Sequence, residues 1–195
     1  MRVAHRGPQG SRTVIKIINV VRKKKEKNTL SFQIMEKLLQ HDPVSVMPVN
    51  KDGRKIETPL MIAVKNGVIE MVKKILELYP STANIGEVND EGKNIVHLAA
   101  EKKQTDVYNY LGKQKILTGS LFQQVDNDGN SALHLAASYG CDRNSDFPGE
   151  VLLMQWERKC FAFVKDSMPR GVFARYNNKL KTADDIFDET HRDPI

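Results

Sequence analysis

The stretch Ser131-Ala132-Leu133-His134-Leu135-Ala136-Ala137 decides the fold, because similar stretches occur twice more at an almost constant spacing. The earlier copies are Thr58-Pro59-Leu60-Met61-Ile62-Ala63-Val64 and Asn94-Ile95-Val96-His97-Leu98-Ala99-Ala100. The copies begin at positions 58, 94 and 131 and are therefore 36 and 37 residues apart. Self-similarity at a fixed period of this length indicates an array of structural repeats.

Each copy has the features expected at the start of a helix. Thr58 and Ser131 are residue types that cap helix N-termini, and Pro59 fits the first helical turn. The sixth position of every copy is alanine, and we expect these small side chains at close contacts between neighbouring repeats: Ala63, Ala99 and Ala136.

Glycines flank the copies on both sides. Gly92 and Gly129 lie in Asn/Asp-rich turns, each two residues before a copy, and Gly67 and Gly140 follow a copy where a helix C-terminus favours glycine. Beyond Gly67, apolar residues at three- and four-residue steps predict a second helix: Ile69, Val72, Leu76 and Tyr79.

This pattern resembles the ankyrin repeat, whose T-P-L-H-x-A motif opens the first of two antiparallel helices. The resemblance implies an all-α ankyrin-repeat solenoid over residues 31–191, with motifs near 58–80, 94–115, 131–168 and 182–191. The residues that match the structural motif are Thr58, Pro59, Leu60, Ala63, Gly67, Gly92, His97, Ala99, Gly129, His134, Ala136 and Gly140.

The two ends of the predicted array are irregular. Ser31 to Gln40 resembles the second helix of an earlier, truncated repeat. A long helix is predicted over 150–168, and the motif then restarts at Thr182, with Leu180 in place of the turn glycine and Asp185 in place of the histidine. Irregular terminal repeats are expected of capping units. The apolar stripe predicted for the long helix is Leu152, Trp156, Cys160 and Phe163/Val164.

A narrower resemblance covers about residues 57–191. The stretches 125–137, Met154-Gln155-Trp156-Glu157, 164–169 and 185–191 are similar to plant ankyrin-repeat membrane proteins with a C-terminal domain named for its Pro-Gly-Gly motif. That family implies a role in plant stress or defence signalling, with the array on the cytosolic face of the plasma membrane. Its transmembrane helices follow the Glu-Thr-His segment, whereas this sequence ends at Ile195. We therefore expect a truncated or alternative product, or an incomplete sequence.

The net charge of +6 is unevenly distributed. Residues 1–27 hold nine Lys/Arg and one acid, a sum of +8, so residues 28–195 sum to −2. The arithmetic excludes a basic body built for nucleic acid, but not a basic N-terminal arm over 1–30. Residues 192–195 are a short C-terminal tail.

The basic arm allows several interpretations. It is a solvated helix end, a contact to an anionic membrane surface through residues 12–27, or a nuclear or nucleic-acid signal. The lack of aromatic residues disfavours specific nucleic-acid recognition. Its apolar face could instead dock on the first repeat as a cap: Val14, Ile15, Ile18 and Val21.

The remaining composition indicates an intracellular chain. The two cysteines, Cys141 and Cys160, form no CxxC pair, which favours a reducing compartment. No stretch approaches the ~18 apolar residues of a membrane-spanning helix, and residues 1–10 lack the apolar core of a secretory signal.

The sequence predicts no catalytic, metal or cofactor site and no small-molecule substrate. Asp126-x-Asp128-x-Asn130 begins like a calcium loop, but Ser131 replaces the required glycine and Ala137 the bidentate glutamate. His97 and His134 are expected to hydrogen-bond the adjoining turns. Trp156 is expected in the core.

We therefore expect a protein–protein interaction module with an unidentified protein partner. Two alternatives remain, namely the soluble portion of a membrane-anchored signalling protein and a nuclear protein acting through the basic arm. Tyr139 is the favoured anchor, since tyrosine is enriched at binding hot spots. The candidate binding surface comprises Lys65, Asn66, Asp90, Glu91, Lys93, Glu101, Lys102, Asn127, Asp128, Asn130, Ser138 and Tyr139.

Overall fold

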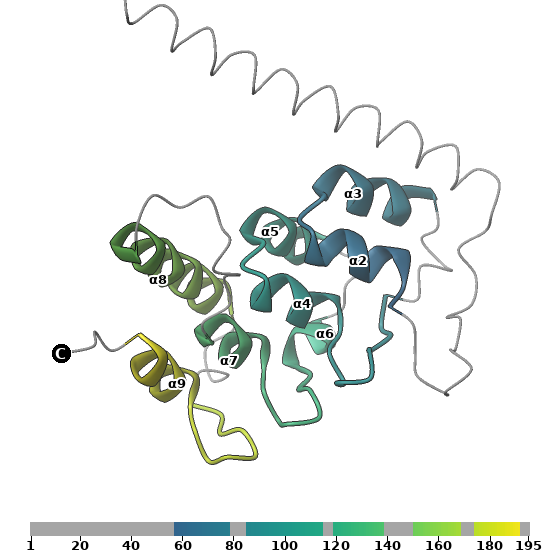
Figure 1. Ribbon diagram of the computed structural model, residues 1–195. Helices are drawn as coiled ribbons and strands as arrows, with labels where there is room; N and C mark the ends of the chain where they lie inside the picture. Colours follow the sequence, from purple (N-terminus) through teal and green to yellow (C-terminus); the bar gives the residue numbers. More distant parts are fainter. Residues whose placement is uncertain (1–56, 79–84, 115–118, 139–149, 169–173, 192–195) are drawn as a thin grey trace, which may run out of the picture. The chain divides into compact units, whose positions relative to one another are not determined.

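The computed structural model describes residues 57–78, 85–114, 119–138, 150–168 and 174–191 (Figure 1). These ranges contain helices, turns and no strand, which confirms the all-α class. Several predictions fall on other residues and lie outside the described part of the chain. They concern the basic arm, the helix over 31–40, Tyr79, Tyr139, Gly140 and the C-terminal tail.

The first helices of the repeats pack side by side in chain order. They are α2 (Pro59–Lys65), α4 (Ile95–Glu101), α7 (Ala132–Ala137) and α9 (Ala183–Thr190). Helix α2 contacts α4, α4 contacts α7, and α7 contacts α9 (Figure 1). The three copies in the sequence and the degenerate fourth motif thus form one continuous layer.

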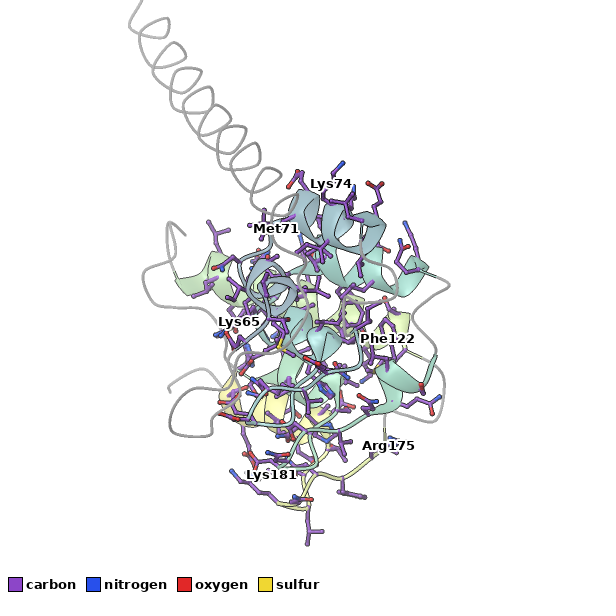
Figure 2. All side chains as sticks on the ribbon, turned by 90° about the vertical axis from the view of Figure 1, so that its right-hand side faces the viewer. Lys65, Met71, Lys74, Phe122, Arg175 and Lys181 are labelled. Carbon is purple, nitrogen blue, oxygen red and sulfur yellow. The ribbon has the colours of Figure 1, made fainter. Side chains whose placement is uncertain are left out.

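The second helices form the other layer. They are α3 (Ile69–Leu78), α5 (Thr105–Lys113) and α8 (Glu150–Ser167). Each packs on the first helix of its own repeat, and α5 also contacts both α3 and α8. A short helix that was not predicted from the sequence, α6 (Gly119–Gln123), precedes the turn at residues 126–130. In Figure 2, Lys74 on α3 and Lys181 in the last turn lie at opposite ends of the view.

The first helices that have neighbours on both sides are the most completely buried. All residues from Ile95 to Ala100 in α4 are buried, and so are all six residues of α7. A helix that is apolar all round is stable only when neighbours cover it completely. Ala63, Ala99 and Ala136 are at most 1% exposed, as small side chains between packed helices should be.

Side chains cap the first helices as the sequence indicates. The Thr58 hydroxyl accepts a hydrogen bond from the backbone N–H of Met61 at 3.1 Å, and Pro59 occupies the first turn. Helices α4, α7 and α9 begin with a capping box, in which the cap residue and the third helical residue bond each other's backbone N–H. The helix starts are therefore fixed locally.

The stripe predicted for α8 is correct in part. Cys160 and Val164 are buried, but Leu152 is 49% exposed, so its placement in the core was wrong. Trp156 and Thr105, the first residue of α5, line the same cavity.

Candidate protein-binding surface

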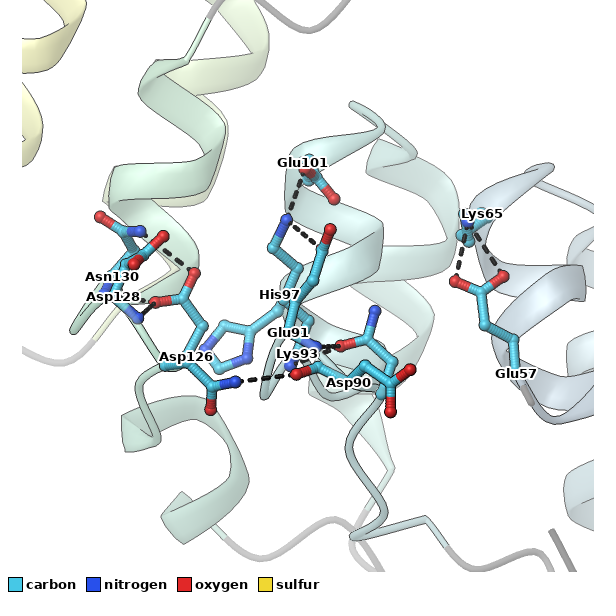
Figure 3. Close-up of polar contacts among 12 residues, drawn as sticks. Glu57, Lys65, Asp90, Glu91, Lys93, His97, Glu101, Asp126, Asp128 and Asn130 are labelled. Atoms are coloured by element: carbon cyan, nitrogen blue, oxygen red, sulfur yellow. Dashed lines mark hydrogen bonds and ion pairs between the residues drawn. The ribbon is translucent and has the colours of Figure 1, made fainter. Parts of the chain in front are cut away.

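Three loops that precede first helices share one hydrogen-bond pattern: Asn89–Lys93, Asp126–Asn130 and Asn177–Lys181. In each loop the first side chain accepts bonds from the N–H groups two and four residues later, at 2.7–3.1 Å. The first N–H also donates to the fifth carbonyl at 2.9–3.0 Å. Asp126 is thus occupied as the acceptor that shapes its loop, as Figure 3 shows.

Consecutive turns also bind each other. Asn127 donates from its backbone N–H to the carbonyl of Glu91 at 3.0 Å and from its amide to the carbonyl of Asp90 at 2.8 Å. Asn178 makes the same two bonds to Asp128 and Asn127, at 2.9 and 3.2 Å. Bonds within and between the turns therefore hold the turn tips in fixed positions.

The histidines join neighbouring repeats, as predicted. Nδ1 of His97 accepts from the backbone N–H of Asn94 at 3.2 Å, so Nε2 carries the hydrogen and donates to the carbonyl of Gln124 at 3.0 Å. The same contacts recur one repeat later, between His134 and the Ser131 N–H (3.2 Å) and Lys181 carbonyl (3.1 Å). Burial lowers the pKa of both imidazoles. Both rings are 1% exposed, which places them in the fold rather than at a reactive surface.

In the last repeat, Asp185 stands where the second and third repeats have the histidine of the capping box. Asp185 Oδ2 accepts hydrogen bonds from the Thr182 N–H at 2.9 Å and the Thr182 hydroxyl at 2.6 Å, and these bonds lower the pKa of Asp185. The carboxylate thus replaces the acceptor nitrogen of histidine. It has no donor for a following turn.

Pairs of side chains recur at equivalent positions of successive first helices. In the first, second and last repeats, the residue just before the helix cap bonds the residue eight positions later. We call the four equivalent pairs rungs: Glu57/Lys65, Lys93/Glu101, Asn130/Ser138 and Lys181/Glu189. The charged rungs are closed by ion pairs of 2.8, 2.8 and 2.5 Å, whereas the third rung is uncharged. Figure 3 shows the first two and Asn130 of the third.

The second rung carries an additional acid. Glu91 lies 2.7 Å from the ammonium of Lys93, which also pairs with Glu101. The hydrogen bond from Lys93 lowers the pKa of Glu91. Burial opposes the charged form of Lys93, but its bonds to Glu101 and Glu91 outweigh this effect and raise its pKa. The Lys93 ammonium is therefore held in ion pairs with Glu91 and Glu101.

The candidate surface residues are accessible within the described ranges. Lys65, Lys93 and Glu101 are half-buried in ion pairs, and Asn130 and Ser138 are half-buried in the uncharged rung. The exposed members lie at the turn tips and helix ends: Asn66, Asp90, Glu91, Lys102, Asn127 and Asp128.

Lys103 is a residue that the sequence analysis missed. It is 4% exposed, has a φ of +55°, and stands one repeat after Gly67, whose φ is +68°. Its ammonium donates to the carbonyl of Ala136 and, at 2.8 Å, to that of Ser138. The sequence feature that could have indicated a special role is a lysine at the position where the first repeat has Gly67. Its role is to bind the C-terminus of α7.

A buried pair joins α8 to the end of α9. Nε2 of His191 lies 2.5 Å from the carboxylate of Glu157, and both side chains are at most 2% exposed. The imidazole stacks on Phe187 at 4.0 Å, and Phe187 stacks on Phe161 at 4.5 Å. Two of the stretches that carry the narrower resemblance therefore contact each other.

A cavity of about 300 Å³ lies between α5 and α8. Trp156 is half-buried and lines it, so the prediction of a core tryptophan holds only in part. The other lining residues are Thr105, Asp106, Asn109, Lys159, Cys160 and Phe163. Across the described ranges, no group of three His, Cys, Asp or Glu side chains could hold a metal ion. No helix there is both long and apolar enough to cross a membrane.

Comparison with known proteins gives consistent matches. The family described as "Ankyrin repeats (3 copies)" matches residues 25–119 and 60–145. A curated relative is the transient receptor potential cation channel subfamily A member 1 homolog of Caenorhabditis elegans, 37% identical over 94 residues. That match spans 48% of this chain and 7% of the relative.

Two solved structures are also similar. The ankyrin-repeat domain of Bcl-3, an IkappaB-family member, is 21% identical with a TM-score of 0.49, over 69% of this chain and 51% of that one. The complex of the Bdellovibrio bacteriovorus predatory endopeptidase Bd0816 with the immunity protein Bd3460 supplies the other. The matched chain of that structure is 19% identical to this chain, with a TM-score of 0.37, over 80% of this chain and 84% of the matched chain.

Proposed function

The chain belongs to the ankyrin-repeat family, and we propose on that basis that it binds a protein partner through its turn tips and the exposed ends of its first helices. An ankyrin array is a protein–protein interaction module and typically a non-enzymatic scaffold. The partner is proposed to occupy the side of the array that carries the turn tips.

The single observation that carries this proposal is the fixed position of the turn tips. The exposed side chains of Asp90, Glu91 and Asp128 belong to loops that are bonded internally and to one another. A surface that is already ordered loses little conformational entropy on binding, so more of the contact energy appears as affinity.

A second, narrower proposal concerns the source and setting of the chain. We propose that it belongs with the plant ankyrin proteins that carry a Pro-Gly-Gly domain, and acts in stress or defence signalling as the array of a membrane-anchored protein. The resemblance of residues 154–157 and 185–191 to that family supports this, and Glu157 and His191 in these two stretches contact each other. Sequencing the transcript beyond the codon for Ile195 tests it, and the absence of codons for apolar helices would count against it.

The basic arm is a candidate contact to anionic lipid at the cytosolic face of the plasma membrane. Each basic residue near such a surface contributes about 1 kcal/mol. Binding of the full chain and of a chain lacking residues 1–27 to phosphatidylserine vesicles tests this. Salt-sensitive binding that the deletion abolishes is expected. Retention on nucleic acid instead would favour the nuclear alternative.

The partner surface is tested with two matched variants. Proteins that co-purify with the chain are identified by cross-linking and mass spectrometry, and the affinity of the recovered partner is measured by calorimetry. Lys102→Ala/Asp128→Ala changes the candidate surface, and Lys73→Ala/Glu77→Ala changes exposed residues of α3 on the other layer. Weaker binding by the first variant alone is expected. Equal binding by both would place the interface elsewhere.

A further inference from the structure

We propose that the third repeat is the centre of the binding interface and that its partner is an uncharged, hydrogen-bonding stretch of polypeptide. The inference rests on the proposed function, since it names what that surface binds. It starts from the one rung that differs, Asn130/Ser138, which carries no charge where the three equivalent rungs carry an ion pair.

The charged rungs are poor sites for the middle of an interface. In each, a lysine and a glutamate already bond each other, so a partner that covers them must take both charges out of water. Charged residues are depleted at the buried centre of protein interfaces and are tolerated at the wetter rim. The Lys93/Glu101 and Lys181/Glu189 rungs therefore fit the rim.

The uncharged rung has hydrogen-bonding capacity to spare. The Asn130 amide donates once, to Asp126 at 3.1 Å, and its oxygen accepts once, from Asn177 at 2.8 Å. An amide has two N–H groups and two lone pairs, so one donor and one acceptor site remain. The Ser138 hydroxyl donates to the carbonyl of His134 at 3.3 Å and keeps its lone pairs for a partner.

The rung is also held in place from both neighbouring repeats. Asn177 of the last turn binds the Asn130 side chain, and Lys103 of the second repeat binds the carbonyl of Ser138. Groups that are positioned before binding cost less entropy to use.

The order of the repeats places this rung between charged ones. Helix α7 packs between α4 and α9, so the Asn130/Ser138 rung has a charged rung on each side. The buried centre of a protein interface is depleted of charged residues, and its rim is polar and solvent-accessible. The fitting partner is a segment rich in Asn, Gln, Ser or Thr, with any charged residues toward its ends.

The probe is a displayed library of random 12-residue peptides selected on the full chain. Asn130→Lys/Ser138→Glu installs the ion pair of the second repeat in the third. The matched control, Lys73→Asn/Glu77→Ser, changes two exposed residues of opposite charge on α3, outside the proposed interface. We expect the selected peptides to have uncharged polar centres. Their affinity for the first variant should be at least about tenfold lower than for the wild-type chain. Their affinity for the control should stay within about threefold of the wild-type value.

A second measurement does not depend on folding of the variants. Hydrogen exchange of the wild-type chain with bound peptide is expected to slow most over residues 130–138. Peptides that bind both variants equally, or that protect residues 57–65 or 181–189 most, would overturn the inference while leaving a binding module in place. Selection that yields no peptide for the wild-type chain would instead count against the proposed function, and the inference with it.

Discussion

The amide oxygen of Asn127 occupies the space that a side chain on Gly92 would need. A Cβ atom built on Gly92 would lie 2.3 Å from Asn127 Oδ1 and 2.8 Å from the Asn127 backbone nitrogen. Gly129 has the same relation to Asn178, at 2.5 Å. Both glycines also have a φ of +75°, so the backbone and the next turn each require glycine.

Gly92→Ala is therefore expected to destabilise the array by at least about 2 kcal/mol, because backbone strain and a clash with backbone act together. Urea denaturation followed by circular dichroism measures the change. Gly86→Ala is the control, since a Cβ there meets nothing within 4 Å and its φ lies outside the left-handed region. Similar losses in the two variants would refute the turn-stacking explanation.

Leu180→Gly is expected to stabilise the protein. Leu180 has a φ of +56° in the position of Gly92, and its side chain is 80% exposed. Relief of left-handed strain is worth about 1–2 kcal/mol, and the greater freedom of glycine in the unfolded chain offsets about half of it. A net gain of about 0.5–1 kcal/mol should appear as a higher urea midpoint. A lower midpoint would mean that the exposed leucine makes contacts we have not recognised.

The two interrepeat histidines are expected to make the protein acid-sensitive. Burial lowers their pKa in the folded state below the ordinary 6.5, so the unfolded chain binds more protons below that pH. Their contribution is fully present above pH 6.5 and is lost as the pH falls through the folded-state values. In a series of melting temperatures measured between pH 8 and pH 5, the melting temperature should therefore decrease as the pH is lowered beneath about 6.5.

His134→Ala provides the comparison for this pH effect. It should cost roughly 1 kcal/mol at pH 7.5 through the lost bonds to Ser131 and Lys181, and it should reduce the slope below pH 6.5. An unchanged slope would assign the acid sensitivity to other groups.

Tyr108→Phe is expected to be neutral or stabilising by up to about 1 kcal/mol. Tyr108 is 1% exposed, and its hydroxyl has no hydrogen-bond partner within the described part of the chain. Its ring packs edge-on against Phe122 and Phe163, contacts that phenylalanine would keep. Removing an unsatisfied buried hydroxyl removes its desolvation penalty. A clear loss of stability on thermal melting would show that the hydroxyl has a partner.

The fold was predictable because its determinants are local and repeated. The helix starts, the turn glycines and the small alanines follow from a few neighbouring residues in each copy, and the period aligns them. The terminal repeat is the informative exception. Leu180 and Asp185 differ from the motif, yet the backbone of Leu180 keeps the left-handed conformation and Asp185 keeps the helix cap.

The candidate surface was only partly predictable, because its properties depend on contacts between repeats. The sequence shows Lys93 as one basic residue among many, and it does not show that Lys93 is committed to Glu91 and Glu101. Lys103 similarly binds carbonyls 33 and 35 residues away. Leu152 was misplaced because a helical stripe does not reveal which of its turns another part of the chain covers.

The buried pair of Glu157 and His191 is expected to matter far more than an exposed one. His191→Ala removes this buried bond and the imidazole that stacks on Phe187, so it should cost about 3–5 kcal/mol. Lys165 and Asp184 form a pair of similar length, 2.6 Å, but their side chains are 37% and 53% exposed. Asp184→Ala should therefore cost less than about 1 kcal/mol. Urea denaturation of both variants and of Glu157→Ala/His191→Ala gives the comparison. If His191→Ala cost no more than Asp184→Ala, the pair would not be what holds α9 to α8.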